Sequence, residues 1–390
     1  MAKERYLTAA VGDDLRDKMI FVGGARQVGK TTFATELVAP NFRGNAYFNW
    51  DNRQDRKRVV ASDWPGDVEL LIFDEIHKYR KWKTLLKGEY DKLKGRYRFL
   101  VTGSARMDIY RRGGDSLQGR YHYYRLHPFS LAEMLGEQRL PEIGGEIEVS
   151  GADRERELAE LLRFGGFPEV LFKGNDRALR RWQNEKIERL FREDIRDSDR
   201  VRDLGAMKLL GDLLPERAGN LLSIQSLCRD IEVSHRAVSN WLEVLESFYY
   251  MYRIRPYNRR VPRSLRKEAK LYLWDWAEVP SEGGRFENLV ASHLLKLIHF
   301  LRDRDGHKLE LYFLRNQEKK EVDFLVAIDS TPWFAVECKL NDESPWPPLR
   351  YFRDRLQIPF VYQLVRRPNV DRFKDGIRVV SAGRFLAGLV

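Results

Sequence analysis

In the first third of the chain, apolar residues form short continuous runs that end in polar or glycine-rich residues. Such runs extend from Met19 to Val22, from Val68 to Phe73 and from Tyr97 to Val101. Runs of this length without alternation are typical of strands buried on both faces, as in parallel sheets. From Thr31 to Val38 the apolar side chains instead recur at helical spacing. The pattern predicts an α/β domain in which buried parallel strands alternate with helices.

The first strand and the helix after it are joined by a phosphate-binding motif. The residues GARQVGKT, from Gly24 to Thr31, match the pattern G-x-x-x-x-G-K-[ST] between a strand and a helix. Backbone amides of such a loop surround phosphate oxygens, its lysine reaches the β- and γ-phosphates, and its hydroxyl ligates Mg²⁺. We therefore expect ATP and Mg²⁺ to bind here, with Lys30 also acting in catalysis. The predicted nucleotide-binding residues are Gly24, Ala25, Arg26, Gln27, Val28, Gly29, Lys30, Thr31 and Thr32.

The two other strands end in polar residues suited to the same reaction. Asp74 and Glu75 follow the second strand, at the carboxyl end where open α/β sheets bind their ligands. The sequence predicts that Asp74, with Thr31, holds Mg²⁺ and that Glu75 activates the attacking water. Ser104 follows the third strand and is predicted to sense the γ-phosphate.

The chain resembles the AAA-type ATPases of bacteria and archaea that carry a C-terminal endonuclease-like domain. The resemblance rests on GGARQVGKTT, LIFDEIHK, FLVTGSAR and SLQGRYHYYRLHPFSLAEM, and it covers nearly the whole chain. Gly119-Arg120 matches a recurrent Gly-Arg pair of the family, which implies that Arg120 reaches the nucleotide of a neighbouring subunit. Arg106, Arg111 and Arg112 are the other arginines in this region. An arginine acting in trans implies a ring or another head-to-tail homo-oligomer.

The middle of the chain contains a helix-turn-helix pattern. Ile224 to Ile231 has one apolar helical face, a three-residue turn follows, and Ser234 is placed to cap a second helix. The family resemblance implies a winged-helix-like unit here, although such units in ATPases also serve as lids or subunit contacts. Side chains in the early turns of the second helix are placed for DNA contact. These are His235, Arg236 and Asn240.

The segment that follows, from Tyr252 to Lys270, has the densest positive charge in the chain. Basic side chains interleaved with tyrosines suit a nucleic-acid backbone and stacked bases. The alternative is a connector that contacts an acidic protein surface. The residues predicted to contact nucleic acid are Arg259, Arg260, Arg263, Arg266 and Lys267.

The stretch EVDFLVAIDSTPWFAVECKL predicts two strands joined by a turn, with charges inside otherwise apolar runs. Glu337 and Lys339 are two residues apart, so both point to one face of a strand. Asp323 shares that face if it pairs with Glu337, which calls for a loop of odd length such as Asp329-Ser330-Thr331. A register shifted by one residue, with Cys338 as the partner, turns Asp323 away.

In the first register the charges resemble the site of the PD-(D/E)xK nucleases. Asp323 and Glu337 are hard oxygen ligands for Mg²⁺ or Mn²⁺, and Glu287 on the preceding helix offers a third carboxylate. Lys339 is placed to position the metal-activated water or to neutralise charge on the phosphate. The alternative is a cross-strand charge pattern on an exposed face. Cys338 is interpreted as a small buried residue.

The length and net charge of the chain favour a protein of several domains with an anionic partner. A chain of 390 residues is long for a single core, and a net charge of +11 favours an anionic partner, nucleic acid first. Cys228 and Cys338 form no zinc or disulfide pattern. Neither a signal peptide nor a run of roughly 18 apolar residues occurs. We therefore expect a cytoplasmic protein without a membrane partner.

These features predict an α/β fold class with three domains. They are an AAA-type P-loop ATPase with a parallel-sheet core over 1–140, a helical and winged-helix-like part over 141–278, and a small α/β restriction-endonuclease-like domain over 279–390. The predicted function is Mg²⁺-dependent ATP hydrolysis coupled to binding or remodelling of double-stranded or branched DNA, with a metal-dependent nuclease domain. The alternative is a nucleotide-switched regulator that binds DNA or protein and whose nuclease-like domain only binds.

Overall fold

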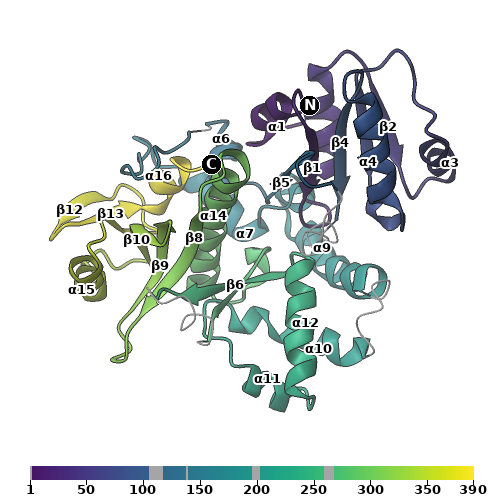
Figure 1. Cartoon of the computed structure of the whole chain (residues 1–390). Coiled ribbons are helices and arrows are strands. Elements are labelled where there is room, and N and C mark those ends of the chain that lie inside the picture. Colours follow the sequence, from purple (N-terminus) through teal and green to yellow (C-terminus); the bar gives the residue numbers. More distant parts are fainter. Residues whose placement is uncertain (1, 105–116, 138, 196–202, 259–267) are drawn as a thin grey trace. The chain divides into compact units, whose positions relative to one another are not determined.

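The chain divides into two compact units, Met1–His127 and Pro128–Val390. The structure is a computed structural model that describes residues 2–104, 117–137, 139–195, 203–258 and 268–390, without the side chains of 192–194. Figure 1 labels the helices and strands. The first unit contains residues 1–127 of the predicted ATPase range, and the second contains residues 128–140 of that range together with the predicted middle and C-terminal parts. The three predicted domain ranges stay predictions.

The first unit is built on a five-stranded parallel sheet in the order β2-β3-β4-β1-β5. Its strands are β1 (Met19–Gly23), β2 (Asn45–Asn49), β3 (Leu70–Asp74), β4 (Arg98–Gly103) and β5 (Tyr121–Arg125). The predicted α/β alternation is confirmed, and the three predicted strands are the central ones. The helices are α1 (Thr8–Asp14), α2 (Lys30–Thr32) continuing as a π-helix (Phe33–Val38), α3 (Arg53–Ala61) and α4 (Trp82–Leu93).

One face of this sheet carries a core rich in aromatic residues. Phe21, Phe73 and Phe99 from three neighbouring strands pack with Trp82 and Tyr90 of α4. All five side chains are at most 7% exposed. This packing fixes the strands, and their carboxyl ends therefore hold the polar residues that follow them in a defined arrangement.

The second unit begins with short helices. They are α6 (Leu131–Leu135), α7 (Glu155–Phe164), α8 (Pro168–Lys173), α9 (Asp176–Arg189), α10 (Leu204–Leu213), α11 (Ile224–Asp230) and α12 (His235–Ser247). Helix α12 starts at the predicted cap, because the Ser234 hydroxyl accepts a hydrogen bond from the Ala237 amide at 3.2 Å. Val238, Trp241, Leu242 and Leu245 form its buried face.

The rest of this unit is an eight-stranded sheet in the order β12-β13-β11-β10-β9-β8-β6-β7. Its strands are β6 (Met251–Pro256), β7 (Lys270–Leu273), β8 (Leu309–Arg315), β9 (Glu321–Ile328), β10 (Thr331–Lys339), β11 (Phe360–Val365), β12 (Asp371–Lys374) and β13 (Ile377–Ser381). Helices α14 (Glu282–Asp305), α15 (Pro347–Leu356) and α16 (Ala382–Ala387) pack on it. Two of the strands, β6 and β7, precede residue 278, so the sheet combines segments that the sequence pattern separates.

The long helix α14 is held by buried polar groups as well as by its apolar face. Lys296 and Glu133 form an ion pair in which both residues are 1% exposed. The Lys296 ammonium also donates to the Ser130 hydroxyl at 2.9 Å. Nearby, the Leu131 amide donates to Nε2 of His293 at 3.0 Å. These contacts join α14 to the start of α6, two helices that are labelled in Figure 1.

The hairpin of β9 and β10 has a different turn from the predicted one. Ile328 pairs with Thr331 across a two-residue turn, Asp329-Ser330, whose φ angles of 49° and 66° suit a primed hairpin turn. The predicted loop of odd length is therefore wrong. A β-bulge between Pro332 and Phe334 then shifts the pairing by one residue. Continuing from the pair Val336–Phe324, this register places Glu337 opposite Asp323, as the first of the two predicted registers does.

Candidate functional site

The phosphate-binding loop connects β1 to α2 and has the backbone shape that its glycines permit. Gly29 has a φ of 100°, in the left-handed region that favours glycine. A Cβ atom on Gly24 would lie 2.4 Å from the backbone oxygen of Leu126, so no side chain fits there. The close passage of the chain at Gly24 explains why the motif begins with glycine.

Lys30 points back into this loop. Its ammonium donates to the backbone oxygens of Gly24 at 3.0 Å and Ala25 at 2.8 Å, and the residue is 7% exposed. The loop therefore folds around a positive charge on its own lysine. Anionic phosphate oxygens are stronger acceptors for this ammonium than backbone carbonyls.

The Asp74 carboxylate, at the carboxyl end of β3, accepts hydrogen bonds from three hydroxyl groups. Its Oδ2 accepts from Thr31 Oγ1 at 2.9 Å and from the Tyr47 hydroxyl at 2.7 Å. Its Oδ1 accepts from Thr102 Oγ1 at 2.7 Å. Thr31 and Asp74 were predicted to act together, and the structure brings them into contact. Burial, together with the hydrogen bond to Asp74, raises the pKa of Tyr47, so this hydroxyl keeps its proton and donates it.

Glu75 follows directly and lies between β3 and β4. Its φ of 57° is unusual for a residue with a side chain and turns the chain sharply after the strand. Its Oε1 accepts from the backbone amide of Ser104 at 3.0 Å, and its Oε2 lies 3.4 Å from Nε2 of His77. Burial raises the pKa of Glu75, while the Lys30 charge opposes this rise. Ser104 thus contacts Glu75 through its backbone.

The predicted trans-acting arginine is engaged within its own unit. Arg120 forms a two-point contact with Asp91 of α4, with nitrogen–oxygen distances of 2.7 Å and 3.0 Å. This hydrogen-bonded pair raises the pKa of Arg120 and lowers that of Asp91. Its role toward a neighbouring subunit stays a prediction. Three other arginines considered for it lie outside the described residues, namely Arg106, Arg111 and Arg112.

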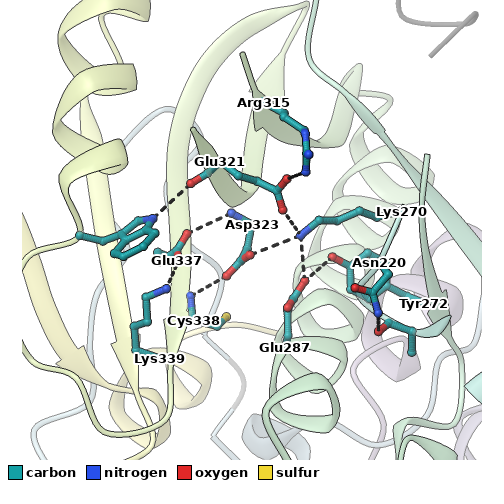
Figure 2. A network of polar contacts seen from close by, with 12 residues as sticks. Asn220, Lys270, Tyr272, Glu287, Arg315, Glu321, Asp323, Glu337, Cys338 and Lys339 are labelled. Carbon is teal, nitrogen blue, oxygen red and sulfur yellow. Dashed lines mark hydrogen bonds and ion pairs between the residues drawn. The ribbon is translucent and has the colours of Figure 1, made fainter. Parts of the chain in front are cut away.

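The second unit gathers acidic residues around one lysine (Figure 2). The ammonium of Lys270, on β7, lies 2.8 Å from Glu321 Oε1, 3.2 Å from Glu287 Oε1 and 3.4 Å from Asp323 Oδ1. Tyr272, two residues along the same strand, donates its hydroxyl to Glu287 at 2.7 Å. We call these residues, with Glu337 and Lys339, the carboxylate cluster.

The predicted nuclease-like residues meet in this cluster through the paired strands β9 and β10. The Asp323 amide donates to Glu337 Oε2 at 3.2 Å, and Asp323 Oδ2 accepts from the Cys338 amide at 2.9 Å. Lys339 lies 2.6 Å from Glu337 Oε1, with its ammonium 3.8 Å from the centre of the Trp346 ring. Asp323, Glu287 and Glu337 are thus near one another, but the Asp323 and Glu287 carboxylates face Lys270 and that of Glu337 faces Lys339.

Burial of so many acids shifts their protonation. It raises the pKa of Glu287 to about 7 and that of Glu337 to about 8, and the nearby Asp323 charge adds to both shifts. Burial opposes the charge on Lys270, but the carboxylates around it outweigh burial and raise its pKa. Cys338 is half-buried, less than its interpretation as a buried residue predicts. Burial of its thiol still raises the pKa of Cys338 far above the usual range, which makes it a poor nucleophile.

This arrangement does not fit the predicted metal ion. Among the residues that the structure describes, no three or more His, Cys, Asp or Glu side chains are placed to hold a metal. The Lys270 ammonium fills the point on which the oxygens of Glu287, Glu321 and Asp323 converge (Figure 2). A metal held by Asp323 and Glu337 needs a different arrangement of these side chains.

The residues that the sequence pattern missed are Tyr47, Thr102, Lys270, Tyr272 and Glu321. Lys270 is the last residue of the basic segment that was predicted to contact nucleic acid. It is 3% exposed, so its ammonium cannot reach a bound nucleic acid. Its signal in the sequence is its position at the start of the apolar run KLYLW, where a charged residue needs a buried partner.

The predicted DNA contacts on α12 lie on its exposed side. His235, Arg236 and Asn240 are all exposed at the beginning of this helix. The five predicted contacts of the basic segment fall outside the described part of the chain. In the described parts, none of the helices combines the length and apolar character needed to cross a bilayer.

Comparison with known proteins gives the family of the first unit only. Residues 16–135 match a family described as an AAA domain. Residues 155–277 and 282–385 match two domains of unknown function, DUF8612 and DUF4143. The first unit therefore contains an AAA-type P-loop ATPase domain, whereas the match of the last part names no nuclease.

Relatives and solved structures are distant. An uncharacterized protein of Methanocaldococcus jannaschii is 22% identical over 84% of this chain and 76% of its own length. An uncharacterized protein of Haemophilus influenzae is 21% identical over 83% of each chain. The RuvB Holliday junction branch migration motor of Thermotoga maritima has a TM-score of 0.30 and 16% identity, covering 63% of this chain and 87% of its own.

Proposed function

We propose that the first unit of this protein hydrolyses ATP with Mg²⁺, and that the bound nucleotide controls how tightly the second unit binds DNA. One observation carries the ATPase part of the proposal. Thr31 of the loop and Thr102 of β4 both donate hydrogen bonds to the Asp74 carboxylate of β3, next to Lys30 and Glu75. Residues from three separate segments thus converge where the motif places phosphates.

The contacts of the site assign a task to each residue. Lys30 exchanges its bonds with the Gly24 and Ala25 carbonyls for bonds with phosphate oxygens, which are stronger acceptors. Thr31 and Asp74 are the groups that would hold Mg²⁺, since a hydroxyl and a carboxylate already lie side by side there. A bound Mg²⁺ would neutralise negative charge on the phosphates. Tyr47 and Thr102 keep Asp74 oriented by donating to its two oxygens.

Glu75 is proposed as the group that accepts the proton of the attacking water. A raised pKa makes a carboxylate a better base, and burial raises the pKa of Glu75. The hydrogen bond from the Ser104 amide fixes one of its oxygens. Since Ser104 lies at the end of β4, a shift of this strand on nucleotide binding would move Glu75 with it.

The proposed DNA contact lies on α12 and on the basic segment after it. The helix-turn-helix pattern and the cap at Ser234 support it, because His235, Arg236 and Asn240 are then exposed at the start of the second helix. The net charge of +11 supports an anionic partner. Double-stranded or branched DNA is the proposed ligand, and a ring or head-to-tail homo-oligomer remains the proposed assembly.

The alternative function is a nucleotide-switched regulator that binds DNA or protein without cutting it. The position of Lys270 favours this alternative for the C-terminal part, because the acids of the nuclease-like motif are neutralised by lysines. We therefore propose cleavage only for a state in which these acids are released. The Mg²⁺ or Mn²⁺ site of Asp323 and Glu337 stays a prediction for that state.

Replacing His235, Arg236 and Asn240 together by alanine is expected to weaken duplex binding about tenfold. Removing one arginine from a phosphate contact also reduces the salt dependence of binding by about one counterion. Fluorescence anisotropy at several salt concentrations measures both effects. Arg156→Ala is the control, since this arginine has an 88% exposed side chain and belongs to another helix, α7. Equal affinities for the triple variant and the wild type would remove α12 from the DNA interface.

A further inference from the structure

Lys270 is an unusual residue to find among acids that were expected to bind a metal. Its side chain is only 4% exposed, so water does not stabilise its positive charge. Three carboxylates surround the ammonium and do so instead. Arg315 contacts the Glu321 carboxylate from another side. A buried ammonium is stable only with such partners, and the partners need it equally.

The distances describe a cage for an ammonium group and not for a metal ion. The three oxygens lie 2.8 to 3.4 Å from the Lys270 nitrogen, the range of charged hydrogen bonds and ion pairs. Oxygens around Mg²⁺ lie at about 2.0–2.1 Å, and around Ca²⁺ at about 2.3–2.6 Å. The carboxylates therefore hold the lysine, and a divalent ion cannot take the same place while it is there.

We propose that Lys270 is an internal counter-cation that keeps the carboxylate cluster closed to divalent ions. Removal of its ammonium opens a site for a hard divalent cation between Glu287, Glu321 and Asp323. The inference deepens the nuclease-like part of the proposed function and does not depend on the ATPase part. According to this inference, Lys270 alone prevents divalent ions from binding the carboxylate cluster, and Lys270 belongs to no known sequence motif.

Strand β6 and the segment just before α11 hold Lys270 in its place in the fold. Lys270 pairs with Ile254 of β6 and bridges to Leu221, while Gly219 lies against the Glu287 carboxylate. The residue before Ile254, Arg253, contacts Glu246 of α12 with a nitrogen–oxygen distance of 2.5 Å. Strand β6, which pairs with the lysine's own strand β7, is thus anchored to the proposed DNA-binding helix within the same unit.

Mn²⁺ binding to nucleotide-free full-length protein tests the inference, with free Mn²⁺ followed by electron paramagnetic resonance. Lys270→Met is expected to bind one Mn²⁺ about tenfold or more tightly than the wild type. Lys270→Met/Glu287→Gln/Asp323→Asn is expected to lose this gain and reports any binding at the phosphate loop. Lys296→Met is the matched control, because it also removes a buried ammonium, one that is paired with the Glu133 carboxylate outside the carboxylate cluster.

Melting temperatures give a second readout that does not depend on activity. Mn²⁺ is expected to raise the melting temperature of Lys270→Met, because an ion that binds only the folded state stabilises it. Mn²⁺ is expected to leave the melting temperatures of the wild type and of Lys296→Met unchanged.

Two results overturn the inference. One is tight Mn²⁺ binding by the wild type that Asp323→Asn abolishes, a measurement that does not require the Lys270 variant to fold. The other is a folded Lys270→Met that binds Mn²⁺ no better than the wild type. If Lys270→Met binds Mn²⁺ but cuts no DNA, the closure by lysine stands and the nuclease part of the proposed function fails.

Discussion

Glu75→Gln is expected to lower the rate of ATP hydrolysis by about 10²–10⁴-fold, the usual contribution of a positioned general base. Glutamine has nearly the same shape and can still accept the hydrogen bond from the Ser104 amide, so the turn after β3 should persist. It cannot take a proton from water. Because Lys30, Thr31 and Asp74 are unchanged, ATP affinity should stay within a few fold of the wild type. Steady-state hydrolysis and equilibrium ATP binding measure the two quantities separately.

Glu69→Gln is the control for this variant. Glu69 lies just before the other end of β3, where its carboxylate accepts from the Arg43 amide at 3.0 Å. The same chemical change there should leave hydrolysis near the wild-type rate. If Glu75→Gln hydrolyses ATP as fast as Glu69→Gln, Glu75 is not the base, and the raised pKa reflects its burial alone.

Lys296→Met is expected to destabilise the second unit by about 3–5 kcal/mol, the usual effect of breaking one side of a buried ion pair. Methionine fills a similar volume, but it removes the Lys296 charge that is paired with the buried Glu133 carboxylate. Glu133 is also part of the cap of α6, where its Oε2 accepts from the Ser130 amide at 3.1 Å. The loss should therefore loosen α6 and the adjoining part of α14 together.

Hydrogen exchange of α14 and α6 amides across a urea series measures this loss, because exchange reports one region of a chain with two units. Lys296→Met/Glu133→Gln is expected to recover most of the stability, since glutamine carries no charge and can keep the cap bond. A double variant as unstable as the single one would show that lost packing, and not the loss of the Lys296–Glu133 ion pair, is responsible.

The sequence pattern predicted the centre of the first sheet better than its edges. The strands β1, β3 and β4 are buried over almost their whole length and appear as continuous apolar runs. Strand β2 is partly exposed, and β5 carries His122 and Arg125, because both lie at the sheet edges where polar side chains reach water. Edge strands lack the apolar run on which the prediction depended.

Contacts between distant segments account for most of the remaining differences. Tyr47 reaches Asp74 only because β2 lies beside β3, which no local pattern indicates. Lys270 belongs to a basic segment by sequence, and only the fold brings Glu287, Glu321 and Asp323 around it. The bulge after Pro332 shifts the pairing with β9, and the alternation of residues in the sequence does not indicate it. Charges and motifs in the sequence therefore predict which residues belong to a site. They predict less reliably which residues these side chains contact.

The central claim is that ATP bound near Lys30 changes the affinity for DNA. The most direct test measures the dissociation constant of a duplex from Glu75→Gln, which retains ATP, with and without ATP and Mg²⁺. A change of about 5–150-fold is predicted, the range of typical coupling between two sites, and Lys30→Ala should abolish it. The same dissociation constant with and without ATP, in a protein that binds both ligands, would contradict the claim.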